Sequence, residues 1–116
     1  MITLYTYKNC STCKKATTYL ESKGIEYDEI AIRETPPSVE ELKHVLEKGR
    51  YEIKKLFNVS GQDYRALNMK EKLPCMTKDE ALALLASNGN LIKRPFVVTD
   101  EAGFVGFKEA EWGALS

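Results

Sequence analysis

MITLYTYKNCSTCKKATTYL, residues 1–20, is the stretch that decides the fold of this chain. Apolar and polar side chains alternate over residues 2–7, which is typical of a strand with one buried face. The alternation then stops, and residues 10–20 carry apolar side chains at helical spacing. This pattern predicts a strand, a tight turn and a helix. It also places a Cys-x-x-Cys motif, Cys10 and Cys13, where the helix begins.

The position of this motif decides what its two thiols can do. Two cysteines three residues apart at the start of a helix lie within one turn, so a disulfide between them can form and open. The first turn also has unpaired amide groups and the positive end of the helix dipole, which stabilise a thiolate. We expect Cys10 to face solvent as a nucleophilic thiolate and Cys13 to lie one turn deeper. Cys10 would then form a mixed disulfide or a thiol adduct that Cys13 resolves.

Two other interpretations of the motif stay open, namely two inert thiols or half of a zinc site. Zinc takes about four ligands, and outside the motif the chain offers only Cys75 and His44. We interpret Cys75, beside Pro74, as a loop or packing thiol. We interpret His44, which lies among charged residues, as a solvated surface residue. The sequence therefore predicts no metal site.

The composition excludes several classes of protein. A chain of 116 residues has the size of one domain with one modest core. Basic and acidic residues both number 17, so no net field favours nucleic acid or an anionic membrane. The sequence has no run of about 18 apolar residues, and its first residues, with their alternating pattern and early cysteine motif, are unlike a secretory leader. Three cysteines, an odd number, indicate reduced or reactive thiols. We expect a cytoplasmic protein, monomeric, that binds neither nucleic acid nor a membrane directly.

The middle of the chain alternates between strand and helix signals. Residues 25–32 suit a second strand that runs parallel to the first and is joined to it by a right-handed crossover. Capping patterns predict one helix over residues 38–49 and another over residues 77–88. We interpret residues 50–76 as short helices, because a structureless loop of that length is unusual in a compact domain.

The end of the chain returns to sheet. Residues 96–99 and 104–107 are short apolar runs on either side of a turn, which is a hairpin signal. Residues 108–112 suit a short helix whose Trp112 packs onto the sheet.

The predicted order of elements, β-α-β, helices, β-β-α, is that of the thioredoxin-like fold. We therefore predict one α/β domain over residues 1–116 with a mixed four-stranded sheet in the order 2-1-3-4, flanked by helices. A mostly helical insertion, at roughly residues 36–90, would lie between the second and third strands. The Cys-x-x-Cys motif would lie at the carboxyl end of the first strand, where α/β sheets bind ligands.

Three segments together resemble the arsenate reductase (ArsC) family and, within it, the Spx-like branch. They are YKNCSTCKKA (residues 7–16), LFNVSGQDYRALN (residues 56–68) and LIKRPFVV (residues 91–98). A fourth segment, GFKE (residues 106–109), adds to the likeness, which spans essentially the whole chain. The resemblance implies a thioredoxin-like domain with redox-active cysteines.

The resemblance also implies a chemistry for the motif. In members that reduce arsenate, a cysteine at the position of Cys10 attacks the oxyanion, arginines hold its oxygens, and glutathione and glutaredoxin complete the cycle. Planar guanidinium groups suit such oxyanions. Here only Arg94 falls on one of those arginines, since Asn58 and Phe107 occupy the other two positions. Those reductases also lack a cysteine at the position of Cys13. We therefore expect an internal disulfide and little arsenate reduction.

The segment around Arg94 would complete the site. The resemblance implies a cis peptide bond before Pro95 that presents backbone groups opposite the reactive sulfur. We expect Arg94, Pro95 and the amides of Ser11 and Thr12 to bind an anionic group, either an oxyanion or a glutathione carboxylate. No bound cofactor is expected. Glutathione would be a cosubstrate, and the partner would be glutaredoxin or a thiol substrate.

The Spx-like branch implies a second hypothesis. Some of its members use a Cys-x-x-Cys motif as a redox switch and bind the C-terminal domain of the RNA polymerase alpha subunit, which changes transcription under thiol stress. On this hypothesis the chain is a binding module rather than an oxidoreductase.

Overall fold

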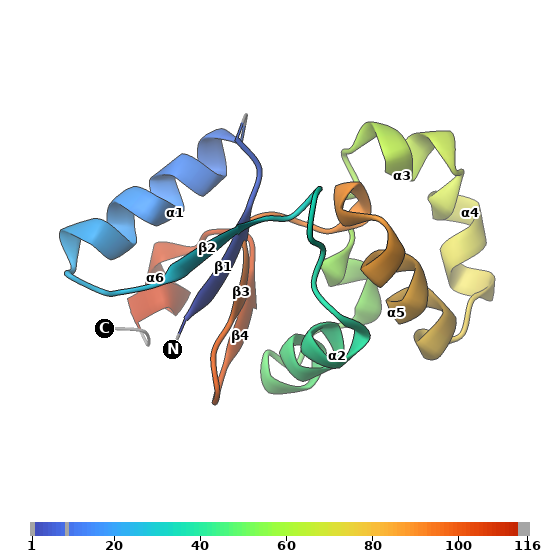
Figure 1. Ribbon diagram of the computed structural model, residues 1–116. Coiled ribbons are helices and arrows are strands. Elements are labelled where there is room, and N and C mark those ends of the chain that lie inside the picture. The colour runs from blue at the N-terminus through green and yellow to red at the C-terminus, as the bar shows by residue number, and fades with distance from the viewer. Residues whose placement is uncertain (1, 9, 114–116) are drawn as a thin grey trace.

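The computed structural model describes residues 2–8 and 10–113 and has a central sheet with helices on both faces (Figure 1). The strands are β1 (Thr3–Thr6), β2 (Asp28–Ala31), β3 (Phe96–Val98) and β4 (Gly103–Val105). The α-helices are α1 (Ser11–Ser22), α2 (Val39–Lys48), α3 (Gln62–Ala66), α4 (Met69–Lys72), α5 (Lys78–Ser87) and α6 (Glu109–Trp112). Short 3₁₀ helices are η1 (Ile53–Leu56), η2 (Leu73–Cys75) and η3 (Gly89–Leu91).

The sheet has the predicted topology. Its order is β2-β1-β3-β4, with β1 parallel to β2 and antiparallel to β3, and with β3 and β4 forming an antiparallel hairpin. Every element between β2 and β3 is helical, as predicted. Because β3 runs antiparallel to β1, with Tyr5 opposite Phe96, the segment that enters β3 meets the segment that leaves β1. This register brings Arg94 and Pro95 to the turn that carries Cys10.

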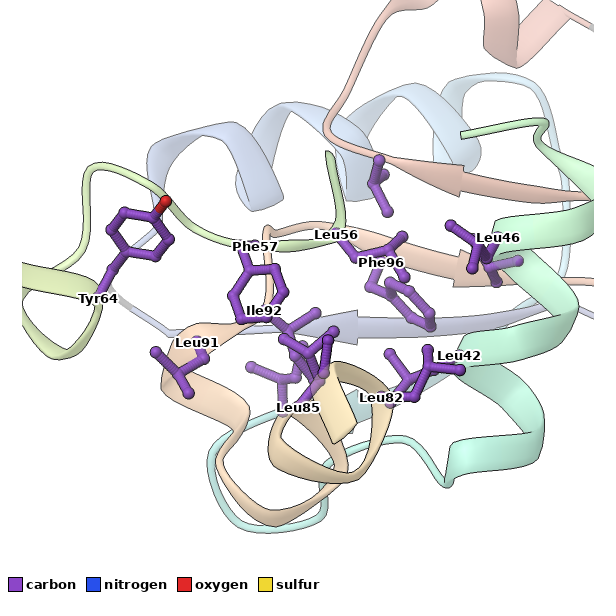
Figure 2. Close-up of a cluster of buried hydrophobic side chains, with 14 of the residues drawn as sticks. Leu42, Leu46, Leu56, Phe57, Tyr64, Leu82, Leu85, Leu91, Ile92 and Phe96 are labelled. Atoms are coloured by element: carbon purple, nitrogen blue, oxygen red, sulfur yellow. The ribbon is translucent and has the colours of Figure 1, made fainter. Parts of the chain in front are cut away.

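The two faces of the sheet have separate cores, because successive strand residues point to opposite faces. On one face, Leu4 and Val97 pack against Ala16 and Leu20 of α1 and against Trp112 of α6. On the other face the sheet packs against the helical insertion, as Figure 2 shows. That second core includes Leu42, Leu46, Leu56, Phe57, Tyr64, Leu82, Leu85, Leu91, Ile92 and Phe96. The packing of Trp112 onto the sheet confirms the prediction for the last helix.

Local capping signals were reliable. Both expected capping boxes are present, Ser38 with Glu41 at the start of α2 and Thr77 with Glu80 at the start of α5. In each box the side chains of the two residues bond to each other's backbone N–H groups. These bonds satisfy amide groups that the first turn of a helix leaves unpaired.

Two strand boundaries differ from the prediction by two residues or more. The strand β2 begins at Asp28 rather than at residue 25, because the N–H of Ile25 still bonds to Leu20 O at the end of α1. The strand β4 ends at Val105 rather than at residue 107. The next residue, Gly106, has a φ of +74° and donates its N–H to the carbonyl of Pro95 at 2.8 Å. A left-handed residue of this kind ends a strand.

The prediction for His44 is also wrong. Its side chain is half-buried rather than solvated, and its Nε2 lies 2.7 Å from the carbonyl oxygen of Thr99. Because a carbonyl oxygen only accepts, Nε2 carries the proton. His44 therefore fastens α2 to the loop between β3 and β4. In the part of the chain that the structure describes, no helix is long and apolar enough to cross a bilayer.

Candidate functional site

Cys10 is the N-cap of α1. After β1 the chain turns tightly, and the N–H of Cys10 donates to the carbonyl of Tyr7 at 3.0 Å. The Sγ atom of Cys10 then accepts the N–H of Cys13 at 3.2 Å, which is the bond that an oxygen makes in the usual N-cap residues. The sulfur thus lies against an open amide group at the positive end of the helix, where negative charge is stabilised.

Cys13 lies one turn further along the helix and is only 3% exposed, whereas Cys10 is half-buried. Both are free thiols. Burial raises the pKa of the Cys13 thiol to about 12, and its hydrogen bond with Cys10 adds to this rise. A backbone hydrogen bond from Tyr7 and the positive charge of Arg94 act in the opposite direction. Cys13 therefore stays protonated at neutral pH, and Cys10 is the more accessible of the two sulfurs.

Arg94 and Pro95 lie opposite this turn, at the entry to β3. The peptide bond between them is cis, as the resemblance implied. Pro95 is buried, and its carbonyl is used within the sheet, where it accepts the N–H of Gly106. The guanidinium carbon of Arg94 lies 5.0 Å from the centroid of the Tyr7 ring. The cation is thus held over an aromatic face next to the turn of Cys10.

Sequence reasoning missed Arg33. Its guanidinium carbon lies 4.9 Å from the centroid of the Tyr7 ring, and its Nη1 donates to the Tyr7 hydroxyl at 2.8 Å. Tyr7 therefore holds two cations, Arg33 and Arg94. One signal could have identified Arg33, namely its position directly after the second strand. The N–H of the preceding residue, Ile32, still bonds to Thr6 O of β1. Residues after parallel strands gather at the same sheet edge as the Cys-x-x-Cys motif.

Two hollows meet at Arg94. The first, which we call the Tyr7 pocket, has a volume of about 260 Å³. It contains both arginines and several amide side chains. Its lining residues are Tyr7, Arg33, Asn58, Gly61, Gln62, Asp63, Asn90 and Arg94. Asn58 thus lies in this pocket with a neutral amide, at the position where the resemblance implies an arginine in arsenate-reducing members.

The second hollow, which we call the lysine pocket, has a volume of about 280 Å³. Most of its charged side chains are basic. It is lined by Thr12, Tyr51, Lys55, Lys93, Arg94, Val105, Gly106, Phe107, Lys108 and Glu111. The ring of Phe107 packs edge-on against that of Trp112, with centroids 4.9 Å apart. An apolar ring therefore occupies the second of the expected arginine positions.

The structure separates the remaining candidate residues from one another. Thr12 is half-buried and lines the lysine pocket, whereas Ser11 is an exposed first residue of α1. Cys75 is exposed in η2, in the helical insertion, and lines neither pocket. Within residues 2–8 and 10–113, no three His, Cys, Asp or Glu side chains gather to hold a metal ion.

Comparison with known proteins identifies a family and several similar proteins. The model of the ArsC family matches residues 5–115. The protein YusI of Bacillus subtilis (strain 168) is 53% identical over 111 residues, which cover 96% of this chain and 94% of YusI. The regulatory protein MgsR of the same strain is 30% identical over 115 residues, which cover 99% of this chain and 90% of MgsR. A crystal structure of an ArsC family related protein from Bacteroides fragilis has a TM-score of 0.95 and 45% identity, covering 99% of this chain and 97% of that one.

Proposed function

Because this chain belongs to the ArsC family, we propose that it is a thiol-disulfide oxidoreductase in which Cys10 attacks and Cys13 resolves. The observation that carries the proposal is the asymmetry of the two sulfurs. Cys10 is accessible and accepts an amide N–H at the helix start, whereas Cys13 is buried and protonated. An accessible sulfur at a helix N-terminus beside a buried, protonated thiol is the arrangement that directs attack to one sulfur.

The reaction is a two-electron exchange. The thiolate of Cys10 attacks one sulfur of a substrate disulfide, forms a mixed disulfide and releases the other sulfur as a thiolate. Cys13 then gives its proton to the released thiolate and attacks the sulfur of Cys10, which releases the second substrate thiolate, and this thiolate takes a proton from water. The substrate is reduced to two thiols, and the protein is left with a Cys10–Cys13 disulfide. Two molecules of glutathione, with glutaredoxin as the partner, would return the protein to its dithiol form.

Arg94 and the amides of Ser11 and Thr12 would hold an anionic part of the substrate during this exchange. Arg94 is suited to this role because it borders both pockets next to the Cys-x-x-Cys turn. Arsenate itself would be a poor substrate. An oxyanion with more than one negative charge needs several cations, and Asn58 and Phe107 supply none.

An activity assay tests the proposal. Reduction of a peptide disulfide by glutathione and glutaredoxin is followed for the wild type, Cys10→Ser and Cys75→Ser. We expect Cys10→Ser to lose activity and Cys75→Ser, which changes an exposed cysteine outside both pockets, to keep it. Equal activity in all three proteins would contradict the proposal. In a parallel assay with arsenate as the oxidant, we expect a rate well below that with the disulfide.

A second candidate function is a redox-controlled regulator. It is favoured by the likeness to the regulatory protein MgsR, which extends over 99% of this chain. On this reading the Cys10–Cys13 pair is a switch, and the partner is the C-terminal domain of the RNA polymerase alpha subunit. Pull-down of that domain with the reduced and with the oxidised protein tests this function. Association should differ between the two states, and no association in either state would dismiss it.

A further inference from the structure

The charges of this chain are unevenly distributed around the site. Basic and acidic residues are equal in number over the whole chain. The lysine pocket nevertheless gathers four cations, Lys55, Lys93, Arg94 and Lys108, against one carboxylate, Glu111. A concave surface with an excess of one charge attracts ligands of the opposite charge. The pocket is therefore suited to an anionic ligand.

Backbone contacts between separate elements fix the positions of these lysines. Lys55 is in η1, and the carbonyl of the next residue, Leu56, accepts the N–H of Lys93 at 2.8 Å. Lys108 is the N-cap of α6, and its carbonyl accepts the N–H of the buried Trp112 at 3.0 Å. The three lysines thus surround one hollow although they are far apart in the sequence.

Gly106 keeps one of these lysines in place. A Cβ atom at this position would lie 3.1 Å from Cε of Lys93, which is closer than ordinary van der Waals contact. The side chain of Lys93 therefore lies across the backbone of Gly106. The glycine both ends β4 and leaves room for the lysine stem along the pocket wall.

The pocket begins at the reactive turn. Thr12, which lies between the two cysteines, lines it, and Arg94 links it to the Tyr7 pocket. Cys10 is two residues before Thr12 in the chain. A group joined to Cys10 in a mixed disulfide would therefore start near this end of the pocket, and its neighbouring atoms would extend toward the lysines.

From this placement we propose that Cys10 prefers disulfides flanked by carboxylates, as in an acidic segment of a polypeptide. The proposal rests on the function proposed above and adds the substrate class. Lys55, Lys93 and Lys108 are specificity residues that bind the flanking carboxylates. They take no part in the transfer of electrons, so a neutral disulfide should react without them.

Glu111 limits this preference. Its carboxylate lies 3.7 Å from Nζ of Lys108, whose side chain is 70% exposed, whereas that of Glu111 is 43% exposed. The Glu111 carboxylate is paired with the ammonium group of Lys108, which an acidic substrate would otherwise contact. Glu111→Gln should therefore increase the preference for acidic substrates, which is opposite in sign to the effect of removing a lysine.

Three peptide disulfides of one length test the proposal, with Glu, Gln or Lys on both sides of the disulfide. The rate of a single turnover with the reduced protein is measured for each peptide at low and at high salt. The pocket variant is Lys55→Gln/Lys93→Gln/Lys108→Gln. The control variant, Lys70→Gln/Lys72→Gln/Lys78→Gln, removes the same three charges from exposed positions in α4 and α5 that line neither pocket.

We expect the wild type to react about tenfold faster with the acidic than with the neutral peptide at low salt, because each contact of an exposed lysine with a carboxylate should raise the rate about two- to threefold. The ratio should fall several-fold in the pocket variant, which keeps Arg94, and to about one at high salt, and it should be unchanged in the control variant. Equal rates with all peptides, or equal losses in both variants, would overturn the substrate preference and leave the oxidoreductase intact. No reaction of the wild type with any peptide would overturn the oxidoreductase itself, and the preference with it.

Discussion

Arg33 donates a hydrogen bond of 2.8 Å from Nη1 to the hydroxyl of Tyr7, and its guanidinium carbon lies 4.9 Å from the centroid of the Tyr7 ring. The same ring holds Arg94 at 5.0 Å. Tyr7 thus fixes two cations at the edge of the sheet where Cys10 lies. An interaction of this kind is worth about 0.5–1 kcal/mol when exposed and more when desolvated.

Two substitutions of Tyr7 distinguish the contribution of its ring from that of its hydroxyl. Tyr7→Phe keeps the aromatic face and loses the hydroxyl that bonds to Arg33, so we expect the rate of Cys10 with an anionic disulfide to fall less than threefold, about 0.6 kcal/mol. Tyr7→Leu releases both guanidinium groups, and we expect a fall of about tenfold. Single-turnover rates of the two variants check this. Equal rates would show that the ring does not position the arginines.

Restoring one arginine should improve arsenate as a substrate. Asn58→Arg places a third guanidinium group in the Tyr7 pocket, beside Arg33 and Arg94. A hydrogen bond to a charged group is worth about 1.5–3 kcal/mol, so we expect arsenate reduction with glutathione and glutaredoxin to rise at least about tenfold. The rate with a neutral peptide disulfide is the control and should not change. An unaltered arsenate rate would mean that Asn58 does not limit that reaction.

The raised pKa of Cys13 predicts a loss of stability in alkali. The folded value is about 12 and the ordinary value is 9.0, so the unfolded chain releases this proton first as the pH rises. The contribution of the Cys13 thiol to the free energy of unfolding is complete below pH 9 and is lost progressively toward pH 12. Between pH 8 and 10.5 the wild type should lose about 1–2 kcal/mol more than Cys13→Ala. Urea unfolding at both pH values measures this difference, and parallel losses in both proteins would contradict the pKa.

Trp112 gives a prediction about stability. Its side chain is completely buried against Tyr19, Phe104 and Phe107. Its Nε1 has no hydrogen-bond partner among the residues that the structure describes. Trp112→Phe therefore removes no hydrogen bond and should cost about 1–2 kcal/mol, whereas Trp112→Ala should cost about 3–5 kcal/mol. Urea unfolding of both variants tests this, and equal costs would indicate an indole hydrogen bond that we have not identified.

Local signals explain why much of the fold could be predicted. The alternation in β1, the Cys-x-x-Cys turn and the capping boxes at Ser38 and Thr77 depend on residues within a few positions of each other. Such signals do not depend on the rest of the chain. The order of the strands followed from the order of the elements, which is that of the thioredoxin-like fold.

Apart from the start of β2, where Ile25 bonds to the nearby Leu20, the errors came from contacts that are distant in the sequence. His44 is half-buried because α2 packs beside the loop that carries Thr99, 55 residues away. The strand β4 stops early because Gly106 bonds to Pro95 across the hairpin. Arg33 joins the site only because β2 pairs with β1, and the lysine pocket exists only because η1, the cis-proline segment and α6 meet. None of these neighbours can be read from a local pattern.

The central claim is that Cys10 attacks and Cys13 resolves. Its most direct test is to treat reduced wild type and Cys13→Ser with a small excess of a labelled peptide disulfide and to map the cysteines by mass spectrometry. We predict a stable mixed disulfide on Cys10 in Cys13→Ser, and a Cys10–Cys13 disulfide with both peptide thiols released in the wild type. A label on Cys13 or Cys75 of the wild type in place of Cys10, or a wild type that keeps the mixed disulfide, would contradict the account.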